Sequence, residues 1–120
     1  MKNKRVVISG IGVLCPIGQN YEHLSSNLKN GKNGISPITQ FDTTNFNVKI
    51  AGEVNINLEE YFDRKELKRM DRYSCLSLIA AEQAIISSGL NKINSIDKQM
   101  VGVIVGSGIG GIKTFEEQHS

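Results

Sequence analysis

Apolar residues in this chain form two continuous runs, and each run meets glycine. The first lies within residues 4–9 and contains Val6, Val7 and Ile8, and the second covers residues 100–105. Short apolar runs bounded by glycine are typical of strands buried on both faces, as parallel strands usually are. We therefore expect two buried parallel strands here, with a third strand over residues 48–54.

Local signals predict helices between these strands. A helix is expected over Tyr21–Lys29, because Asn20 is a favoured N-cap and Gly31 a favoured left-handed stop. Residues 32–46 are rich in Asn, Gly, Ser and Thr, which predicts an ordered surface loop. A last helix is expected to begin near Lys113.

Residues 63–88 carry the longest helical pattern. A break is predicted near Asp71, which can cap a second helix that ends at Gly89. The second half of this segment is apolar on most of its circumference, as expected of a helix buried between layers, and its small residues permit a close neighbour. The alternation of strands and helices predicts a layered α/β fold. Because 120 residues supply too few covering layers and the chain stops within its last predicted helix, we expect it to be part of a longer protein.

Composition excludes several classes of protein. The chain is 39% hydrophobic and 22% charged, as globular chains are, and its net charge of +2 is too small for a surface built to bind nucleic acid. No apolar run approaches the roughly 20 residues of a membrane span, and no signal-peptide core is present. Two cysteines without metal-ligand spacing predict neither a disulfide framework nor structural zinc. We expect a cytoplasmic protein.

A glycine-rich segment at residues 106–111 matches the GxGxxG pattern of dinucleotide-binding turns. That pattern normally opens its βαβ unit, whereas about 100 residues precede it here. A tight structural turn is therefore the favoured interpretation. Ile109 is the only large side chain in the turn, so it is the candidate for closing a pocket.

Basic residues are concentrated between Arg64 and Arg72. At 100° per residue four of them share one helix face: Lys65, Lys68, Arg69 and Arg72. The opposite face carries Leu67, Met70, Ser74 and Leu78. A solvated face and a docking site for an acidic or phosphate-bearing partner are about equally favoured.

Nucleophile and metal chemistry find little support in the sequence. Cys15 has no neighbouring base or helix N-terminus, so a packed thiol is favoured, and Cys75 lies on the apolar helix. His23 and His119 lack metal-spaced partners and are interpreted as surface residues. The chain therefore shows no complete catalytic constellation.

Several short motifs, taken in order, closely resemble the N-terminal part of β-ketoacyl-[acyl-carrier-protein] synthase II, a family of condensing enzymes. They lie at residues 5–12, 16–18, 31–38, 41–42, 51–52, 70–72 and 106–111. The resemblance implies that residues 1–120 are the N-terminal part of a thiolase-like domain with αβαβα layers, usually a homodimer. It implies decarboxylative Claisen condensation of malonyl and acyl thioesters carried by acyl carrier protein.

The resemblance also assigns roles within the chain. The family's catalytic cysteine and histidines belong to later segments, so no catalytic residue is expected here and the chain alone should be inactive. Ile109 resembles the isoleucine that gates the acyl pocket, and Lys65, Lys68 and Arg69 resemble the patch that docks acyl carrier protein. No cofactor is implied, since phosphopantetheine arrives on the carrier, and neither is nucleic acid or a membrane span.

Two other functions stay open from the sequence. One is a noncatalytic subunit that docks carrier protein or pairs with a catalytic partner in a polyketide-type synthase. The other is a nucleotide-binding module that uses the glycine-rich turn.

Overall fold

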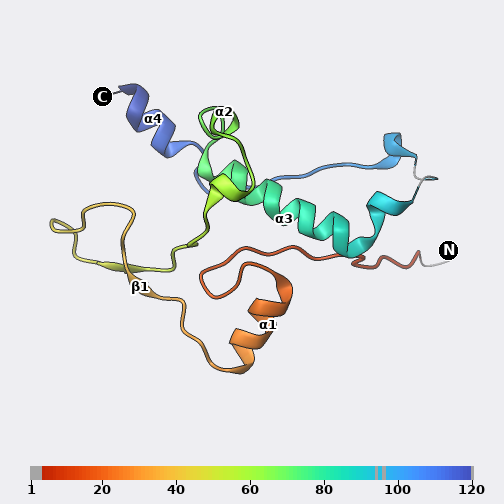
Figure 1. Ribbon diagram of the computed structural model, residues 1–120, viewed down its shortest axis with the longest axis horizontal. Coiled ribbons are helices and arrows are strands. Elements are labelled where there is room, and N and C mark those ends of the chain that lie inside the picture. Colours follow the sequence, from red (N-terminus) through yellow and green to blue (C-terminus); the bar gives the residue numbers. More distant parts are fainter. Residues whose placement is uncertain (1–3, 94, 96, 120) are drawn as a thin grey trace.

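The computed structural model describes residues 4–93, 95 and 97–119, and Figure 1 shows their arrangement. The α-helices are α1 (Tyr21–Lys29), α2 (Arg64–Leu67), α3 (Arg72–Ser88) and α4 (Ile112–His119). The remaining elements are strands β1 (Ser36–Pro37) and β2 (Ile50–Ala51) and the 3-10 helices η1 (Leu58–Glu60), η2 (Leu90–Lys92) and η3 (Lys98–Met100). The long helix α3 lies in the middle of the molecule. Residues 101–110 lead back from its C-terminal end to its N-terminal end, where α4 begins (Figure 1).

The predicted helix ends are confirmed where the signal is local. The Asn20 side chain accepts a 2.8 Å hydrogen bond from the amide of His23 and caps α1. Past the end of α1, Gly31 has a φ of 65°, and Gly89 closes α3 with a φ of 72°. The predicted break between two helices is confirmed as well, because α2 ends at Leu67 and α3 starts at Arg72.

The N-terminal segment packs closely on α3. A Cβ atom on Gly10 would overlap the carbonyl oxygen of Ala84, and one on Gly12 would overlap that of Ala80. The backbone of this segment therefore lies directly against the small residues of the helix. This confirms that the Ala positions of α3 permit a close neighbour.

The predicted parallel strands are wrong for the described residues. Residues 4–9 and 101–105 are irregular, and Met100 belongs to η3. Of residues 48–54, only Ile50–Ala51 pairs, and its antiparallel partner Ser36–Pro37 lies inside the predicted loop. A strand requires a neighbouring strand to which its backbone is hydrogen-bonded. Among the described residues, no segment pairs with either apolar run in this way.

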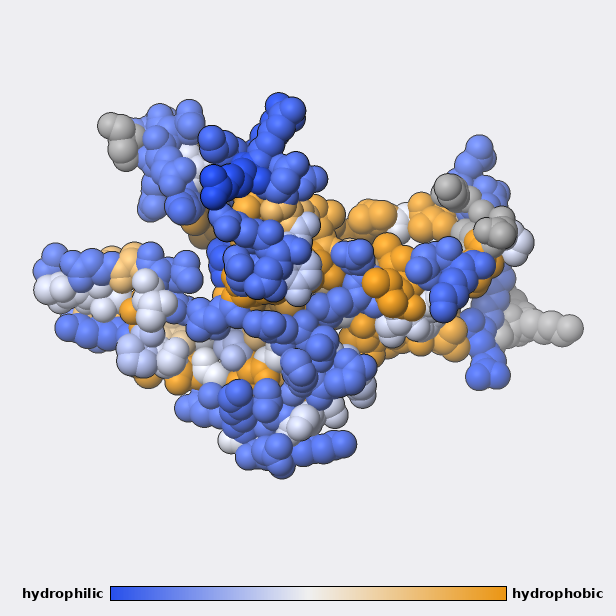
Figure 2. Space-filling view, viewed as in Figure 1, coloured by the Kyte–Doolittle hydropathy of each residue, from blue (hydrophilic) through white to orange (hydrophobic). Residues whose placement is uncertain are grey.

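Much of α3 is exposed in the described residues, so its predicted burial between the layers of a longer protein stays a prediction. Only Cys75 and Ile79 are buried hydrophobic residues among those described, whereas Leu78 is 50% exposed. The residues of the two apolar runs are exposed too. Figure 2 shows orange, hydrophobic patches at the surface in the middle and right of the view. The radius of gyration is 18.0 Å, against about 14 Å for a compact domain of this length. These residues therefore do not form a closed, self-sufficient core.

No helix in the described part of the chain is long and apolar enough to cross a membrane.

Candidate functional site

The glycine-rich turn is seated on the first turn of α3. The Thr114 hydroxyl donates a hydrogen bond to Oδ1 of Asp71. A Cβ atom on Gly110 would lie 2.9 Å from Cζ of Tyr73, and one on Gly111 would lie 3.1 Å from Oδ2 of Asp71. Gly111 also has a φ of 69°, which glycine adopts without strain. The structure thus brings the glycine-rich turn next to the end of the basic segment.

The first half of the same turn has no such support. Cβ atoms built on Gly106 and Gly108 meet no atom within 4 Å. Ile109 lies between the open half and the seated half, and it is 76% exposed. It lines none of three cavities that described residues form around α1 and α3. Its role at an acyl pocket therefore stays a prediction.

The basic segment presents three of its predicted cations to solvent. Lys65, Lys68 and Arg69 are exposed, and no ion pair to them is found among the described residues. The nearby Glu66 side chain accepts a 2.9 Å hydrogen bond from the amide of Asp63 instead. Within the described chain, the positive charge of this segment is available to a partner.

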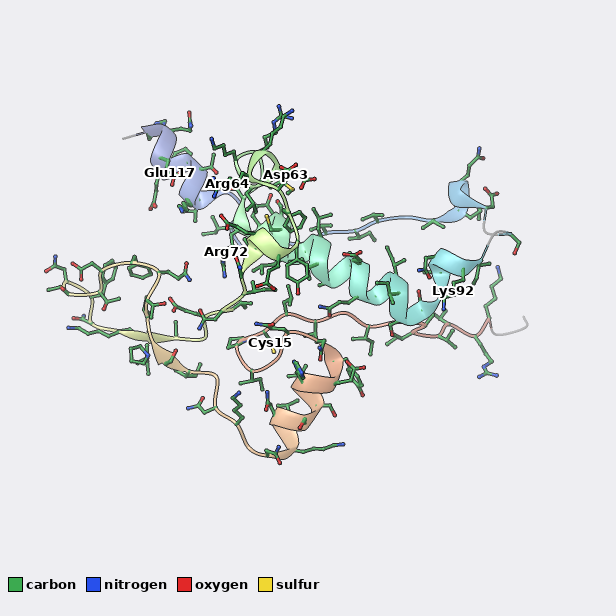
Figure 3. All side chains as sticks on the ribbon, viewed as in Figure 1. Cys15, Asp63, Arg64, Arg72, Lys92 and Glu117 are labelled. Carbon is green, nitrogen blue, oxygen red and sulfur yellow. The ribbon has the colours of Figure 1, made fainter. Side chains whose placement is uncertain are left out.

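Arg72 is a correction to the predicted basic face. Arg72, labelled in Figure 3, is half-buried, and its guanidinium donates a hydrogen bond to the carbonyl oxygen of Val54. The helical wheel failed here because α2 stops at Leu67, so one wheel does not describe both helices. Leu78, which the wheel places on the face opposite the cations, is half exposed.

The two thiols differ in their surroundings. Cys75 is 1% exposed, and burial raises the pKa of its thiol, so the packed-thiol interpretation is confirmed. Cys15 is half-buried and lines a cavity of about 210 Å³ together with His23 from α1. This neighbour was not predicted from the sequence, since a spacing of eight residues carries no signal. No hydrogen bond between Cys15 and His23 is found in the described structure.

The histidines are both on the surface, as predicted. His23 is exposed on α1, and His119 is exposed on α4, where its ring stacks on Phe115 at a centroid distance of 4.8 Å. Among the described residues, no group of three His, Cys, Asp or Glu side chains is arranged to hold a metal ion.

The dinucleotide interpretation of the glycine-rich turn loses its structural context. A dinucleotide fingerprint joins a strand to a helix, and α4 does begin at Ile112. The residues before the turn, 101–105, are irregular in this structure rather than a strand. The turn therefore lacks half of the arrangement that places a pyrophosphate on a helix N-terminus.

Comparison with known proteins places this arrangement in a family. The profile described as "Beta-ketoacyl synthase, N-terminal domain" matches residues 3–120. The chain belongs to the β-ketoacyl synthase family. Within that family, the chain is 44% identical over 119 residues to "3-oxoacyl-[acyl-carrier-protein] synthase 2" of Staphylococcus aureus (strain COL), covering 98% of this chain and 28% of that protein. The protein of the same name from Synechocystis sp. (strain ATCC 27184 / PCC 6803 / Kazusa) is 40% identical over 121 residues, covering 100% and 29%.

A solved β-ketoacyl synthase relative supports the same fold. The structure described as "The ishigamide ketosynthase/chain length factor" superposes with a TM-score of 0.63 at 29% identity, covering 80% of this chain and 23% of that one. The family and this match show that the chain has part of a thiolase-like fold, as predicted. The chain spans a little over a quarter of the length of the curated relatives that it matches.

Two contacts of the described structure, near the basic segment and the glycine-rich turn, were not predicted from the sequence. The Asp63 and Glu66 side chains form a capping box at α2, a pairing that the Asp-x-x-Glu spacing signals. The hydrogen bond between Asp71 and Thr114 joins residues 43 positions apart, and no local pattern announces it.

Proposed function

We propose that residues 1–120 are the N-terminal part of the thiolase-like domain of a β-ketoacyl-[acyl-carrier-protein] synthase of type II, a cytoplasmic homodimer that extends fatty acyl chains. The observation that carries this proposal is 44% identity over 119 residues to proteins named 3-oxoacyl-[acyl-carrier-protein] synthase 2. The exposed apolar runs and the exposed side of α3 support it, because such surfaces are normally covered by further layers of a fold.

The proposed reaction joins two thioesters. An enzyme cysteine takes the acyl group from the phosphopantetheine sulfur of acyl carrier protein, and the carrier leaves as a thiol. Malonyl carrier protein then loses CO₂, and the resulting carbanion attacks the acyl-enzyme carbonyl carbon. The cysteine leaves as a thiolate, and the product is a 3-oxoacyl carrier protein two carbons longer. The cysteine and its two histidines lie outside residues 1–120 in this proposal, and no resident cofactor is required.

The basic segment would take part before the chemistry. Lys65, Lys68 and Arg69 are exposed cations next to the first turn of α3, on which the glycine-rich turn sits. An acidic carrier protein would be steered to such a surface, and salt would weaken the encounter. Ile109 would then contact the acyl chain at the entrance of its pocket.

The test is a condensation assay on the protein as its gene encodes it. Acyl carrier protein charged with an acyl chain and labelled malonyl carrier protein should give one 3-oxoacyl product and one CO₂ per turnover. A gene product that makes no product would overturn the proposal.

A noncatalytic pairing subunit is the second candidate, because the solved structure that matches this chain is described as a ketosynthase with a chain length factor. An inactive gene product that activates a separate ketosynthase would favour it. Saturable binding of NADPH, followed by fluorescence, would instead favour the nucleotide-binding module.

A further inference from the structure

Asp71 occupies a helix N-cap position but does not cap. An N-cap aspartate normally accepts hydrogen bonds from the amides two or three residues on, as Asp63 does at α2 from Lys65 and Glu66 at 2.7 and 2.8 Å. At α3 the Asp71 side chain makes no such bond. A residue that breaks a local rule in this way is often held by a tertiary interaction.

The Asp71 carboxylate is instead directed to the glycine-rich turn and α4. Its Oδ1 accepts the hydroxyl proton of Thr114 in the first turn of α4. Its Oδ2 lies 3.1 Å from the position that a Cβ atom on Gly111 would occupy. One carboxylate therefore lies against Gly111 and binds Thr114, and a hydrogen bond to a charged acceptor is stronger than one between neutral groups.

This contact fixes only one end of the segment that carries Ile109. Beyond Gly110, which meets the Tyr73 ring, the chain turns into α4. On the other side, Gly106 and Gly108 have open space around them. Ile109 thus lies one residue from the seated end, and the position of its side chain depends on how firmly that end is held.

We propose that the hydrogen bond between Asp71 and Thr114 positions Ile109 and thereby sets the range of acyl-chain lengths that the enzyme accepts. The assignment of an acyl chain to Ile109 rests on the proposed function; the positioning of the turn does not. Asp71 and Thr114 are positioning residues, since they act on the acyl chain through Ile109. Weakening the bond should let Ile109 move more easily out of the path of the acyl chain. The enzyme should then accept longer acyl chains better.

The test uses Thr114→Val, which keeps the shape of the side chain and removes its hydroxyl, and Thr114→Ser, which keeps the hydroxyl. The matched control is Thr44→Val, because the Thr44 hydroxyl donates a 2.6 Å hydrogen bond to Asp42 in the same way but far from the turn in sequence. All variants are made in the gene product, and two measurements are taken on each.

The first measurement is amide hydrogen exchange of the peptide that spans residues 106–112. Thr114→Val should speed this exchange about fivefold, whereas Thr114→Ser and Thr44→Val should leave it unchanged. Unchanged exchange in Thr114→Val would overturn the positioning role, whether or not the protein condenses acyl chains.

The second measurement is the ratio of kcat/KM for a long and a short acyl carrier protein. Thr114→Val should raise this ratio about fivefold, with Thr114→Ser close to the wild type. An equal loss for both chain lengths would show a merely structural role and overturn the specificity claim. A wild-type protein without any condensation product would count against the proposed function, while the exchange experiment would still decide the positioning claim.

Discussion

Gln83 of α3 holds the N-terminal segment through Val13, 70 residues earlier in the chain. Its Oε1 accepts a 3.0 Å hydrogen bond from the Val13 amide, and its Nε2 donates a 2.8 Å hydrogen bond to the carbonyl oxygen of Gln19. One amide side chain thus supplies an acceptor and a donor to two points of the segment that leads into α1. Gln83 therefore holds the segment between Gly12, which packs on α3, and the start of α1.

Changing Gln83→Glu should destabilise the protein while keeping part of this link. An ionised carboxylate still accepts from the Val13 amide but has no proton to donate to Gln19, so we expect a loss of about 1–3 kcal/mol in the free energy of unfolding. Thermal unfolding of the gene product measures it. The same change at exposed Gln118 is the control and should cost less than about 0.5 kcal/mol. Equal effects at both sites would contradict the prediction.

Changing Gly12→Ala should disturb the packing of the N-terminal segment on α3. The new Cβ atom would overlap the backbone carbonyl of Ala80, and a backbone group cannot move aside as a flexible side chain can. We expect a loss of about 1–3 kcal/mol, as for other overpacked sites. Gly102→Ala serves as the control, because its Cβ atom meets nothing within 4 Å. A Gly12→Ala protein as stable as the Gly102→Ala protein would disprove the close contact.

The stability that Glu53 contributes should depend on pH. Hydrogen bonds from Thr39, led by its 2.7 Å hydroxyl bond, hold the pKa of the Glu53 carboxyl below its ordinary value of 4.5. Because the folded state favours the ionised form, this contribution is complete above pH 4.5 and is lost as the pH falls through the lowered pKa. Thr39→Val should therefore lower Tm at pH 6, with a difference that shrinks as the pH falls below 4.5. A difference that stays constant down to pH 3 would be inconsistent with this role.

Charge reversal of the basic segment should weaken the use of acyl carrier protein. Replacing Lys65, Lys68 and Arg69 with Glu should raise KM for carrier-bound substrates about tenfold or more and leave kcat nearly unchanged, because it removes electrostatic steering. The effect should decrease at high salt. A control variant reverses three exposed lysines elsewhere, Lys29, Lys49 and Lys92. If both triple variants raise KM equally, net charge rather than this segment determines binding.

Enlarging Ile109 should shift the acyl-chain preference towards short chains. In Ile109→Phe the bulkier ring would fill space that a long chain needs, and we expect kcat/KM for long chains to fall about tenfold relative to short ones. Product lengths measured by mass spectrometry provide the comparison. Ile112→Phe, at the start of α4, should leave the product lengths unchanged. No shift in Ile109→Phe would remove this residue from the acyl pocket.

The site was predictable from the sequence only in part. Residue type and spacing predict the exposed positions of Lys65, Lys68 and Arg69. They also predict that Ile109 lies in a glycine-rich turn. Arg72 was misplaced because its partner, the Val54 carbonyl, lies 18 residues away and across a helix break. Tyr73 could not be expected under Gly110, since the two residues meet only after the chain has passed along the whole of α3 and back.

The sequence by itself determined the helices α1 and α3 and where they end. Asn20 caps α1 through an amide three residues away. Gly31 and Gly89 end their helices in the left-handed conformation, which glycine adopts without a distant partner. Tertiary structure alone decided whether residues 4–9 and 100–105 pair as strands and where the Asp71 carboxylate points. Strand pairing and that carboxylate's hydrogen bond both depend on partners distant in the chain. A hydrophobic pattern indicates which residues favour a buried position, but it does not specify the segment that pairs with them or covers them.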